Sequence, residues 1–308
     1  MTQSFYSNGK LLITSEYVVL DGALALALPT TLGQHLDVET ISEPEIQWIS
    51  LDENNAIWFE DTFNLELLTS TSKTSKNPVS QRLSSLLKIA KRNNPEFLST
   101  NVEERGFKVT TRLDFARDWG LGSSSTLINN MALWANVDPM TLLSHTFGGS
   151  GYDIACARHN TPILYQVGDP AKVQEVGFDP SFKNELFFIH RNKKQNSRES
   201  ISTYKQNKTN SKAIIKQIDS ITSQLLNAGN RTEFDGLIGQ HERLIGVVTN
   251  QTPIKEDLFP DYKYAIKSLG GWGGDFILAT GPKPYVHDYF NSKSYTTILS
   301  YSELILNS

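Results

Sequence analysis

The sequence lacks the features of an exported, membrane-spanning or nucleic-acid-binding protein. Its 308 residues include one cysteine, Cys156, so no disulfide can form within the chain, which is typical of a reducing compartment. The net charge is −4, from 29 Lys and Arg against 33 Asp and Glu, with no long run of Lys or Arg. This pattern excludes the basic surface by which proteins bind nucleic acid.

A long hydrophobic run is also missing. The first ten residues have no apolar core of the kind found in signal peptides, and the apolar segment after them is interrupted by Glu16 and Asp21. We therefore expect a cytoplasmic protein that neither crosses a membrane nor is exported. With 39% hydrophobic and 20% charged residues, the chain is long enough to form two lobes, each with its own core.

The two most familiar nucleotide-binding motifs are absent as well. No G-x-x-x-x-G-K-[ST] sequence occurs, and no G-x-G-x-x-G sequence opens a helix. A nucleoside triphosphate would therefore have to bind to a different scaffold.

The periodicity of the apolar residues predicts a mixture of strands and helices. Strands are expected at residues 11–19, 23–28, 34–41, 46–51, 56–59, 107–113, 185–190 and 276–279. Helices are expected at residues 81–92, 127–134, 139–146, 211–228 and 233–249. The Asp21-Gly22 pair predicts a hairpin between the first two strands. Residues 69–78 have the polar composition of a mobile loop or a surface linker.

The most informative segment is 118–126 (DWGLGSSST), which places glycines and hydroxyls between a predicted strand and a predicted helix. Its glycines let the backbone approach a ligand, and the free amides and dipole of the first helical turn favour an anion. A serine-rich turn that only caps the helix has the same appearance. Taken alone, the segment fits both a phosphate site and a helix cap.

Three further segments each have a functional and a plain structural interpretation. Lys10 stands at the start of a predicted strand, where a lysine is commonly solvated. Asp153, in the sequence GSGYDIA at 149–155, is placed to cap a helix. Residues 270–275 (GGWGGD) contain four glycines in five positions before a strand, which requires either a strained turn or a backbone that lies close to a ligand.

Taken in order, these segments resemble the GHMP kinase superfamily, named for its galactokinase, homoserine, mevalonate and phosphomevalonate members. Residues 8–22 (NGKLLITSEYVVLDG) look like its first motif, in which Gly-Lys leads into a strand and then into Gly-Glu followed by His or Tyr. Residues 120–124 match the second, phosphate-binding motif. Residues 150–153 match the segment that supplies the catalytic aspartate in mevalonate-type members, and the string GYDIA suggests a particular subgroup. Residues 267–275 resemble the third motif and end in aspartate, as in phosphomevalonate kinases.

The resemblance spans nearly the whole chain and implies an α+β fold in two lobes. The N-terminal domain, residues 1–170, would bind ATP and contain a left-handed βαβ connection. The C-terminal domain, residues 171–308, would be ferredoxin-like. The handedness follows from the family alone, because crossovers between parallel strands are nearly always right-handed.

The resemblance also implies roles for single residues in transfer of the γ-phosphoryl group of ATP. Asp153 would accept or orient the proton of the acceptor hydroxyl, and Lys10 would pair with it, keep it ionised and stabilise charge on the transferred group. The nucleotide-binding residues would be Gly120, Leu121, Gly122, Ser123, Ser124 and Ser125, with Ser124 also reaching Mg²⁺. The substrate-binding residues would be Glu16, Tyr17, Gly151, Tyr152, Lys194, Ser197, Gly273, Gly274 and Asp275.

Some positions depart from the family pattern. Ser15 occupies the place of a glycine in the first motif, and Leu269 and Trp272 replace small residues of the third. A member of the family that binds a metabolite without phosphorylating it is therefore an alternative, although Lys10 and Asp153 are both retained.

A further departure concerns the magnesium ion. The glutamate that helps to bind it in mevalonate kinase is missing, because counting back from Asp153 leads to Leu142. Magnesium would then be held by Ser124 and the nucleotide phosphates, or by an acidic residue elsewhere, for which Asp118 is one candidate.

The basic run 190–198 (HRNKKQNSR) bears on the acceptor. It follows a predicted strand and resembles the segment in which related kinases place residues that contact the substrate, and a solvated loop is an equally good interpretation. If it faces the substrate, it favours an anionic acceptor, and mevalonate and phosphomevalonate both meet that condition. The aspartate that ends the third motif favours this isoprenoid branch, with a sugar or a homoserine-type hydroxy acid as the alternative.

Overall fold

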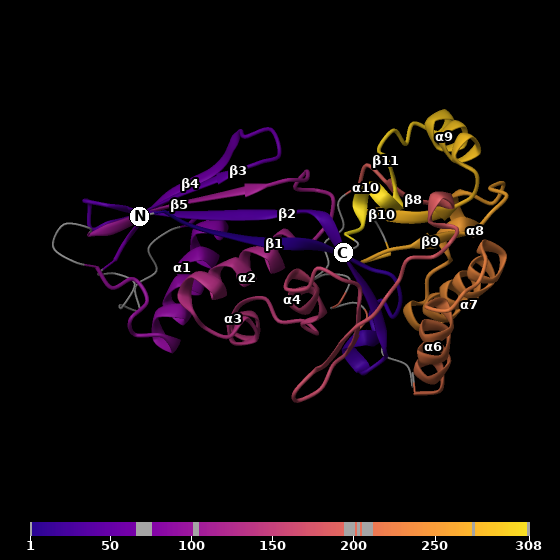
Figure 1. Cartoon of the computed structure of the whole chain (residues 1–308), viewed down its shortest axis with the longest axis horizontal. Helices are drawn as coiled ribbons and strands as arrows, with labels where there is room; N and C mark the ends of the chain where they lie inside the picture. Colours follow the sequence, from indigo (N-terminus) through magenta and orange to yellow (C-terminus); the bar gives the residue numbers. More distant parts are fainter. Residues whose placement is uncertain are drawn as a thin grey trace. The chain divides into compact units, whose positions relative to one another are not determined.

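The computed structural model describes residues 2–65, 76–100, 105–193, 201, 204, 212–272 and 275–306 (Figure 1). The chain forms two compact units that are not continuous in sequence. The first unit consists of Met1–Gly9, Leu32–Arg117 and Gly122–Arg158. The second unit consists of Lys10–Thr31, Asp118–Leu121 and His159–Ser308. Two short N-terminal segments that carry candidate site residues therefore belong to the second unit.

The first unit contains a mixed sheet. Its strands are β1 (Thr2–Leu12) and β2 (Ala25–Ile41), each in part, with β3 (Glu45–Leu51), β4 (Ile57–Asn64) and β5 (Gly106–Leu113). The strand order is β4-β3-β5-β2, and β1 also pairs with β2. β3 and β5 are parallel, whereas β3–β4 and β2–β5 are antiparallel. The chain reaches β5 from β3 through β4 and a helix, as parallel neighbours require.

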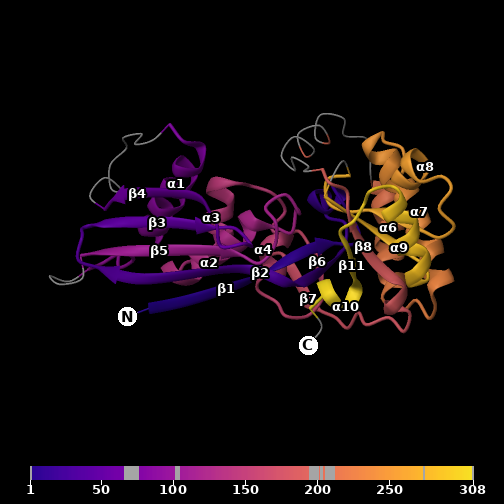
Figure 2. The same cartoon turned by 90° about the horizontal axis from the view of Figure 1, so that it is seen from above.

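The helices of the first unit are α1 (Pro78–Asn93), α2 (Ser123–Ala135), α3 (Pro139–Thr146) and α4 (Tyr152–Ala157). Figures 1 and 2 show them on one face of the sheet. α3 begins as the sequence predicts, because the Asp138 side chain accepts from the Thr141 N–H and Pro139 occupies the first helical position. The core between sheet and helices includes Trp48, Leu86 and Ile128.

The second unit contains a four-stranded antiparallel sheet in the order β11-β8-β10-β9. Its strands are β8 (Leu186–His190), β9 (Ile266–Ser268), β10 (Phe276–Thr280) and β11 (Ile298–Ser300). The helices are α6 (Lys212–Leu225), α7 (Arg231–Thr249), α8 (Ile254–Leu258), α9 (Lys283–Ser292) and α10 (Tyr301–Leu304), with short 3₁₀ helices η1 (Val18–Asp21) and η3 (Lys183–Glu185). Strand β6 (Ile163–Gln166) pairs with the N-terminal part of β2, and strand β7 (Lys172–Glu175) pairs with β6.

The α+β class, with one mixed and one antiparallel sheet, is confirmed. The hairpin expected at Asp21-Gly22 is wrong, because β1 ends at Leu12 and η1 precedes β2. Ser15 and Tyr17 have φ angles of 72° and 63°, which end the strand. The left-handed βαβ connection stays a prediction, and residues 69–75 of the polar stretch lie outside the described residues.

No helix within the described parts of the chain is long and apolar enough to cross a membrane.

Candidate active site

The predicted phosphate-binding loop leads into the N-terminus of α2, in the first unit. Gly122 is the N-cap residue, and its φ of 95° is a conformation that glycine adopts without strain. No side chain caps the helix; instead the Ser125 hydroxyl donates to the Gly122 carbonyl oxygen at 2.8 Å. The first helical bond runs from the Thr126 N–H to the same oxygen. The amides of the first turn therefore lie at the open end of the helix, and the interpretation of the serines as an N-cap is wrong.

Asp153 lies in the first turn of α4, which packs against α2 within the first unit. Its side chain is partly buried. The N-cap residue of α4 is Gly151, with φ 88°, so the aspartate does not cap its helix. The neighbouring Ser150 and Tyr152 are buried, and the Tyr152 N–H is 3.5 Å from the Ser150 hydroxyl. The first unit thus carries the amides predicted to bind phosphate and the acidic residue on two contacting helices.

Lys10 lies in the second unit, near the end of β1. Its backbone N–H donates to the carbonyl oxygen of Leu121 at 2.9 Å, and the Leu121 side chain is fully buried. The Lys10 side chain is partly exposed. The first motif and the segment that precedes Gly122 are therefore joined through the backbone.

Gly120 lies against Asp275, the last residue of the third motif. Its φ is 67°, and a Cβ atom on it would be 2.4 Å from the carboxyl carbon of Asp275. Asp275 is itself buried and has a φ of 53°. The second and third motifs therefore meet in the second unit, and glycine is needed at position 120 both for its backbone conformation and for this approach.

Aromatic side chains support the same segment. The Trp119 ring makes an edge contact with Phe276, with ring centroids 5.5 Å apart, and the His190 ring lies 5.2 Å from Phe276. His190 Nε2 is 3.3 Å from the carbonyl oxygen of Asp118. Residues at the start of β10 and the end of β8 thereby hold segment 118–120 in place.

A buried charge network surrounds Glu16. The Lys267 ammonium donates to Glu16 Oε1 at 2.5 Å, to the Ser268 carbonyl oxygen at 2.9 Å and to Glu242 Oε1 at 3.4 Å. The Ser268 hydroxyl donates to Glu242 Oε2 at 3.0 Å. Glu16 and Lys267 are 0% exposed, so this network lies inside the second unit.

Burial perturbs the ionisation of this network. It raises the pKa of Glu16 to about 7, although the Lys267 ammonium opposes the change. It also raises the pKa of Glu242, with Lys267 again opposing. Burial, assisted by the charge of Lys267, lowers the pKa of His241 well below its usual value. His241 is therefore neutral, and its Nε2 accepts the backbone N–H of Ser15 at 2.9 Å.

The turn at Ser15 and Tyr17 explains one departure from the family pattern. Ser15 stands where the first motif has glycine, and its φ of 72° is the conformation that glycine adopts most easily. Its hydroxyl donates to the Leu24 carbonyl oxygen at 2.6 Å, which helps to hold this strained backbone. The Tyr17 hydroxyl donates to the carbonyl oxygen of Gly271 at 2.7 Å. The first motif therefore also contacts the third.

Four predicted substrate-binding residues, Lys194, Ser197, Gly273 and Gly274, lie outside the described residues. The start of the basic run can be placed, because the Arg191 N–H donates to the Asp275 carbonyl oxygen at 2.7 Å and the Asp275 N–H donates to that of Lys193 at 2.8 Å. Burial lowers the pKa of the Arg191 guanidinium, and the nearby carboxylates oppose this. The basic run therefore begins beside the third motif.

Three residues of the network had no role in the prediction from sequence. Lys267 belongs to the third motif as quoted, and His241 and Glu242 lie in the helix expected at 233–249. Adjacent ionisable residues on a helix are usually solvated. The burial of His241 and Glu242 could have been indicated only by their place on the apolar face of α7, with Leu237, Ile238 and Ile245.

The structure also fits a magnesium nucleotide in one respect. Ser124 is exposed in the first turn of α2, where its hydroxyl would lie beside phosphates held by the amides. In the portion of the chain that can be described, no group of three or more His, Cys, Asp and Glu side chains could hold a metal ion.

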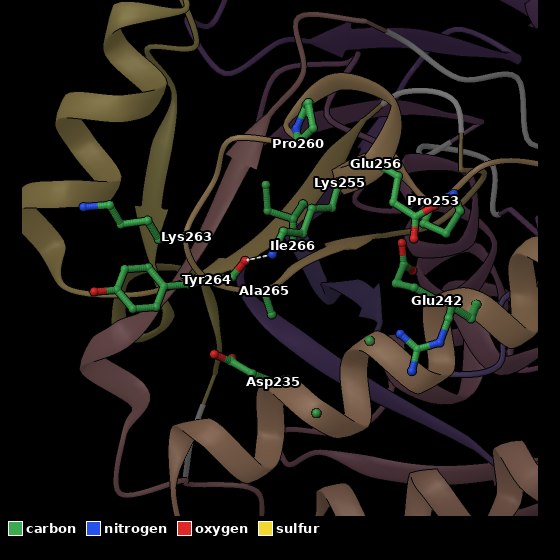
Figure 3. A pocket seen from close by; sticks show the side chains of 13 residues that line it. Asp235, Glu242, Pro253, Lys255, Glu256, Pro260, Lys263, Tyr264, Ala265 and Ile266 are labelled. Carbon is green, nitrogen blue, oxygen red and sulfur yellow. Dashed lines mark hydrogen bonds between the residues drawn. The ribbon is translucent and has the colours of Figure 1, made fainter.

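A cavity of about 610 Å³ lies in the second unit, between α7, α8 and the segment that leads into β9 (Figure 3). Glu242 and Glu256 are on its wall, together with Asp235, Lys255 and Tyr264. The cavity therefore reaches the buried network at Glu242.

Comparison with known proteins identifies the fold. No model of a known protein family matches the sequence, and no curated protein sequence matches it. Solved structures match it throughout. A mevalonate kinase from Methanococcus jannaschii superposes with a TM-score of 0.73 at 15% identity, covering 100% of this chain and 99% of that one.

Two further structures extend the comparison. Streptococcus pneumoniae phosphomevalonate kinase, in complex with phosphomevalonate and AMPPNP, has a TM-score of 0.71 at 18% identity, with 97% and 98% of the two chains covered. Lactococcus lactis galactokinase, complexed with galactose, has a TM-score of 0.68 at 12% identity, with 100% and 94% covered. All three proteins are GHMP kinases, as the motifs predicted. The chain has the fold of the GHMP kinase superfamily.

Proposed function

We propose that the protein is an ATP-dependent kinase that transfers the γ-phosphoryl group to an anionic small molecule, with mevalonate or phosphomevalonate as the acceptor. The observation that supports this most directly is the contact between Gly120 and Asp275, because it joins the phosphate-binding and glycine-rich motifs beside the first residues of the basic run. The fold and the AMPPNP bound by the pneumococcal enzyme agree with a nucleotide substrate.

The nucleotide would bind at the start of α2. Backbone N–H groups of residues 122–125 and the positive end of the helix dipole would hold its phosphates. Magnesium, bound through Ser124 and the phosphates, would neutralise charge on the transferred group. Gly122 has no side chain to occupy the space of the phosphates, and the neighbouring Ser124 is exposed.

In the transfer step an acceptor oxygen attacks the γ-phosphorus, and the bond from that phosphorus to the β–γ bridging oxygen breaks, releasing ADP. With a hydroxyl acceptor, Asp153 would take up the proton that the oxygen loses. Lys10 would stabilise the charge of the transferred group. With a phosphate acceptor the attacking oxygen is already ionised, so Asp153 would have no proton to take up.

The acceptor would be recognised by its charge. Arg191 and Lys193 adjoin Asp275, and the rest of the basic run follows them in the sequence. A carboxylate or phosphate suits these cations better than a neutral sugar does. The match to galactokinase nevertheless keeps a sugar as the second candidate acceptor.

The test is a panel of acceptors. Mevalonate, phosphomevalonate, homoserine and galactose would each be supplied with ATP and magnesium, and ADP release would be followed in a coupled assay. We expect turnover with mevalonate or phosphomevalonate. Calorimetric titration with ATP, with and without magnesium, identifies the alternative, because a protein that binds ATP but releases no ADP with any acceptor is a metabolite-binding member of the fold.

A further inference from the structure

The ammonium group of Lys267 has three protons and three acceptors. These are Glu16 Oε1, Glu242 Oε1 and the carbonyl oxygen of Ser268. The transfer mechanism proposed for the kinase gives no role to any side chain of this network. A buried ammonium with a complete set of partners is costly to assemble, so its presence beside a candidate site calls for a specific role.

The network connects three elements that are distant in sequence. Glu16 belongs to the turn before η1, Lys267 to β9, and Glu242 to α7, and 251 positions separate Glu16 from Lys267. Ser268, which follows Lys267 in β9, bonds to Glu242 through its hydroxyl. The third motif continues directly from β9, so the network fixes the start of that motif relative to the first.

The turn that Glu16 occupies is strained. Both its neighbours, Ser15 and Tyr17, have positive φ angles, a conformation that costs about 1–3 kcal/mol for a residue other than glycine. The turn therefore needs external contacts to persist. These come from His241, which accepts the Ser15 N–H, and from Lys267, which holds Glu16. On the other side of the turn, the Tyr17 hydroxyl donates to the carbonyl oxygen of Gly271, in the third motif.

We propose that Lys267 and Glu242 are positioning residues. By holding ionised Glu16, they fix the strained turn at residues 15–17 against the glycine-rich third motif. The position of this turn then sets the affinity for the acceptor. The proposal rests on the proposed kinase function. Glu16 is completely buried, so it acts on the acceptor through Tyr17 and Gly271 and not by contact.

The charges of the network make the proposal testable by pH. Glu16 and Glu242 carry two negative charges against the single positive charge of Lys267, so the network gains a proton more easily than an ordinary ion pair does. The titratable groups that face Glu16 are Lys267 from β9 and His241 and Glu242 from α7. α6 packs nearby through Thr222, which donates to the hydroxyl of Thr14.

Protonation of Glu16 removes its charge attraction to Lys267, and the turn then loses the contact that holds it. Burial, and the nearby charge of Glu242, raise the pKa of Glu16 to about 7. Replacing Glu242 by Gln removes that negative charge and keeps the shape of the side chain, so Glu16 should remain ionised to lower pH. A like charge at this distance shifts a pKa by about one unit or more.

The experiment measures the Michaelis constants for the acceptor and for ATP between pH 5.5 and 8.5, in wild type and in Glu242→Gln. We expect the acceptor constant of wild type to rise as the pH falls through about 7, while the ATP constant stays level. In Glu242→Gln the midpoint moves to lower pH, so that at pH 6 its acceptor constant is about fivefold lower than that of wild type, for a shift of about one unit.

Glu256→Gln is the matched control. Glu256 lies on α8, and its side chain lines the same cavity as that of Glu242 (Figure 3). Its loss removes an equal charge without touching Lys267, so its pH profile should follow wild type. The proposal is overturned if the midpoint of the acceptor constant is the same in Glu242→Gln as in wild type. It is also overturned if Glu256→Gln shifts that midpoint by the same amount as Glu242→Gln.

Lys267→Met supplies a second variant with a different expectation. It leaves Glu16 without its cation, so the acceptor constant should be raised at every pH and should no longer depend on pH near 7. If this variant does not fold, the Glu242→Gln comparison decides the matter alone, because glutamine keeps the size of the side chain and one oxygen that can accept from Lys267.

Infrared difference spectroscopy separates this proposal from the proposed function. A buried protonated carboxyl group that loses its proton near pH 7 should be visible in wild type, absent in Glu16→Gln, and shifted to lower pH in Glu242→Gln. If no acceptor on the panel is phosphorylated, the kinase function fails and the infrared titration still tests the network. An active kinase whose carboxyl band does not shift in Glu242→Gln overturns the positioning role alone.

Discussion

Gly120 lies so close to Asp275 that a Cβ atom on the glycine would be 2.4 Å from the carboxyl carbon of the aspartate. Gly120→Ala therefore forces the two motifs apart, in addition to placing alanine at a φ of 67°. We expect a loss of stability of about 2–4 kcal/mol, from backbone strain and overpacking together, measured by urea unfolding.

Gly148→Ala is a control for the backbone strain that alanine suffers at a positive φ angle. Gly148 has nearly the same φ, 65°, but nothing lies within 4 Å of a Cβ atom built on it. Its alanine variant should lose only about 1 kcal/mol. Equal losses in the two variants would show that the contact with Asp275 is not maintained in solution.

The sequence predicted those elements whose signals are local. α3 has a capping aspartate and a first-turn proline. α1 begins in the same way at Asn77 and Pro78, although the prediction placed both residues in a loop and began this helix at residue 81. Strand β5 shows regular alternation between polar and apolar residues. The motif resemblance predicted the fold, although the mevalonate kinase structure that covers the whole chain is only 15% identical to it.

The parts that could not be predicted depend on long-range contacts or on unusual backbone angles. Nothing in the composition of residues 15–17 signals the positive φ angles that end β1 and replace the expected hairpin. Nothing in the sequence indicates that Lys267 pairs with Glu16, because 251 positions separate them. Burial decides which charges pair, and it is a property of the tertiary structure.

Asp153→Asn should abolish phosphoryl transfer to a hydroxyl acceptor and leave ATP binding nearly unchanged, because the carboxylate serves the acceptor. Loss of a positioned base lowers kcat by about 10²–10⁴-fold. ADP release and calorimetric titration with ATP measure the two effects. Asp138→Asn is the control, since asparagine caps a helix as well as aspartate does, and α3 should be unaffected. Turnover equal to wild type in Asp153→Asn would remove this residue from the mechanism.

Substitutions at the start of α2 should separate magnesium from nucleotide binding. Ser124→Ala removes a hydroxyl but leaves the backbone amides, so it should weaken the response to magnesium more than ATP binding alone. Gly122→Val should damage both, because a branched side chain enters the phosphate site at a φ of 95°. Ser144→Ala, an exposed serine of α3, should change neither. ATP binding that Gly122→Val leaves intact in calorimetry would contradict the phosphate site.

The raised pKa of Glu16 predicts how stability depends on pH. Between its ordinary value, 4.5, and about 7, the folded protein retains a proton on this group that the unfolded chain has lost. The contribution of Glu16 is therefore fully present below about pH 4.5 and is lost as the pH rises through about 7. Glu16→Gln cannot lose a proton, so its stability relative to wild type should increase from pH 5 to pH 8 in urea unfolding.

Ionisation of His241 changes the stability with pH in the opposite direction, so its effect must be separated from that of Glu16. Its pKa is lowered in the folded state, so it contributes stability that is present above its ordinary value of 6.5 and is lost as the pH falls. Both proteins contain His241, and comparing them at each pH therefore isolates Glu16. A difference between wild type and Glu16→Gln that is constant across this range would contradict the raised pKa.

The basic run distinguishes an anionic from a neutral acceptor. Changing Lys193, Lys194 and Arg198 to Ala should raise the Michaelis constant for a carboxylate or phosphate acceptor and spare that for ATP, because ground-state binding is lost and transition-state stabilisation is not. Lys193 is exposed, so the effect should shrink at high salt, given a screening length of about 8 Å at physiological ionic strength.

Lys183→Ala provides the control for a general change in charge. Lys183 is the first residue of η3 in the same unit, and its ammonium lies 2.7 Å from the Asp179 carboxylate. Its loss therefore alters the net charge without altering the basic run. Its acceptor constant should equal that of wild type at every salt concentration. If the triple variant also behaves like wild type, the basic run is a solvated loop, and the acceptor is then a neutral molecule such as a sugar, because no charge of the acceptor is recognised there.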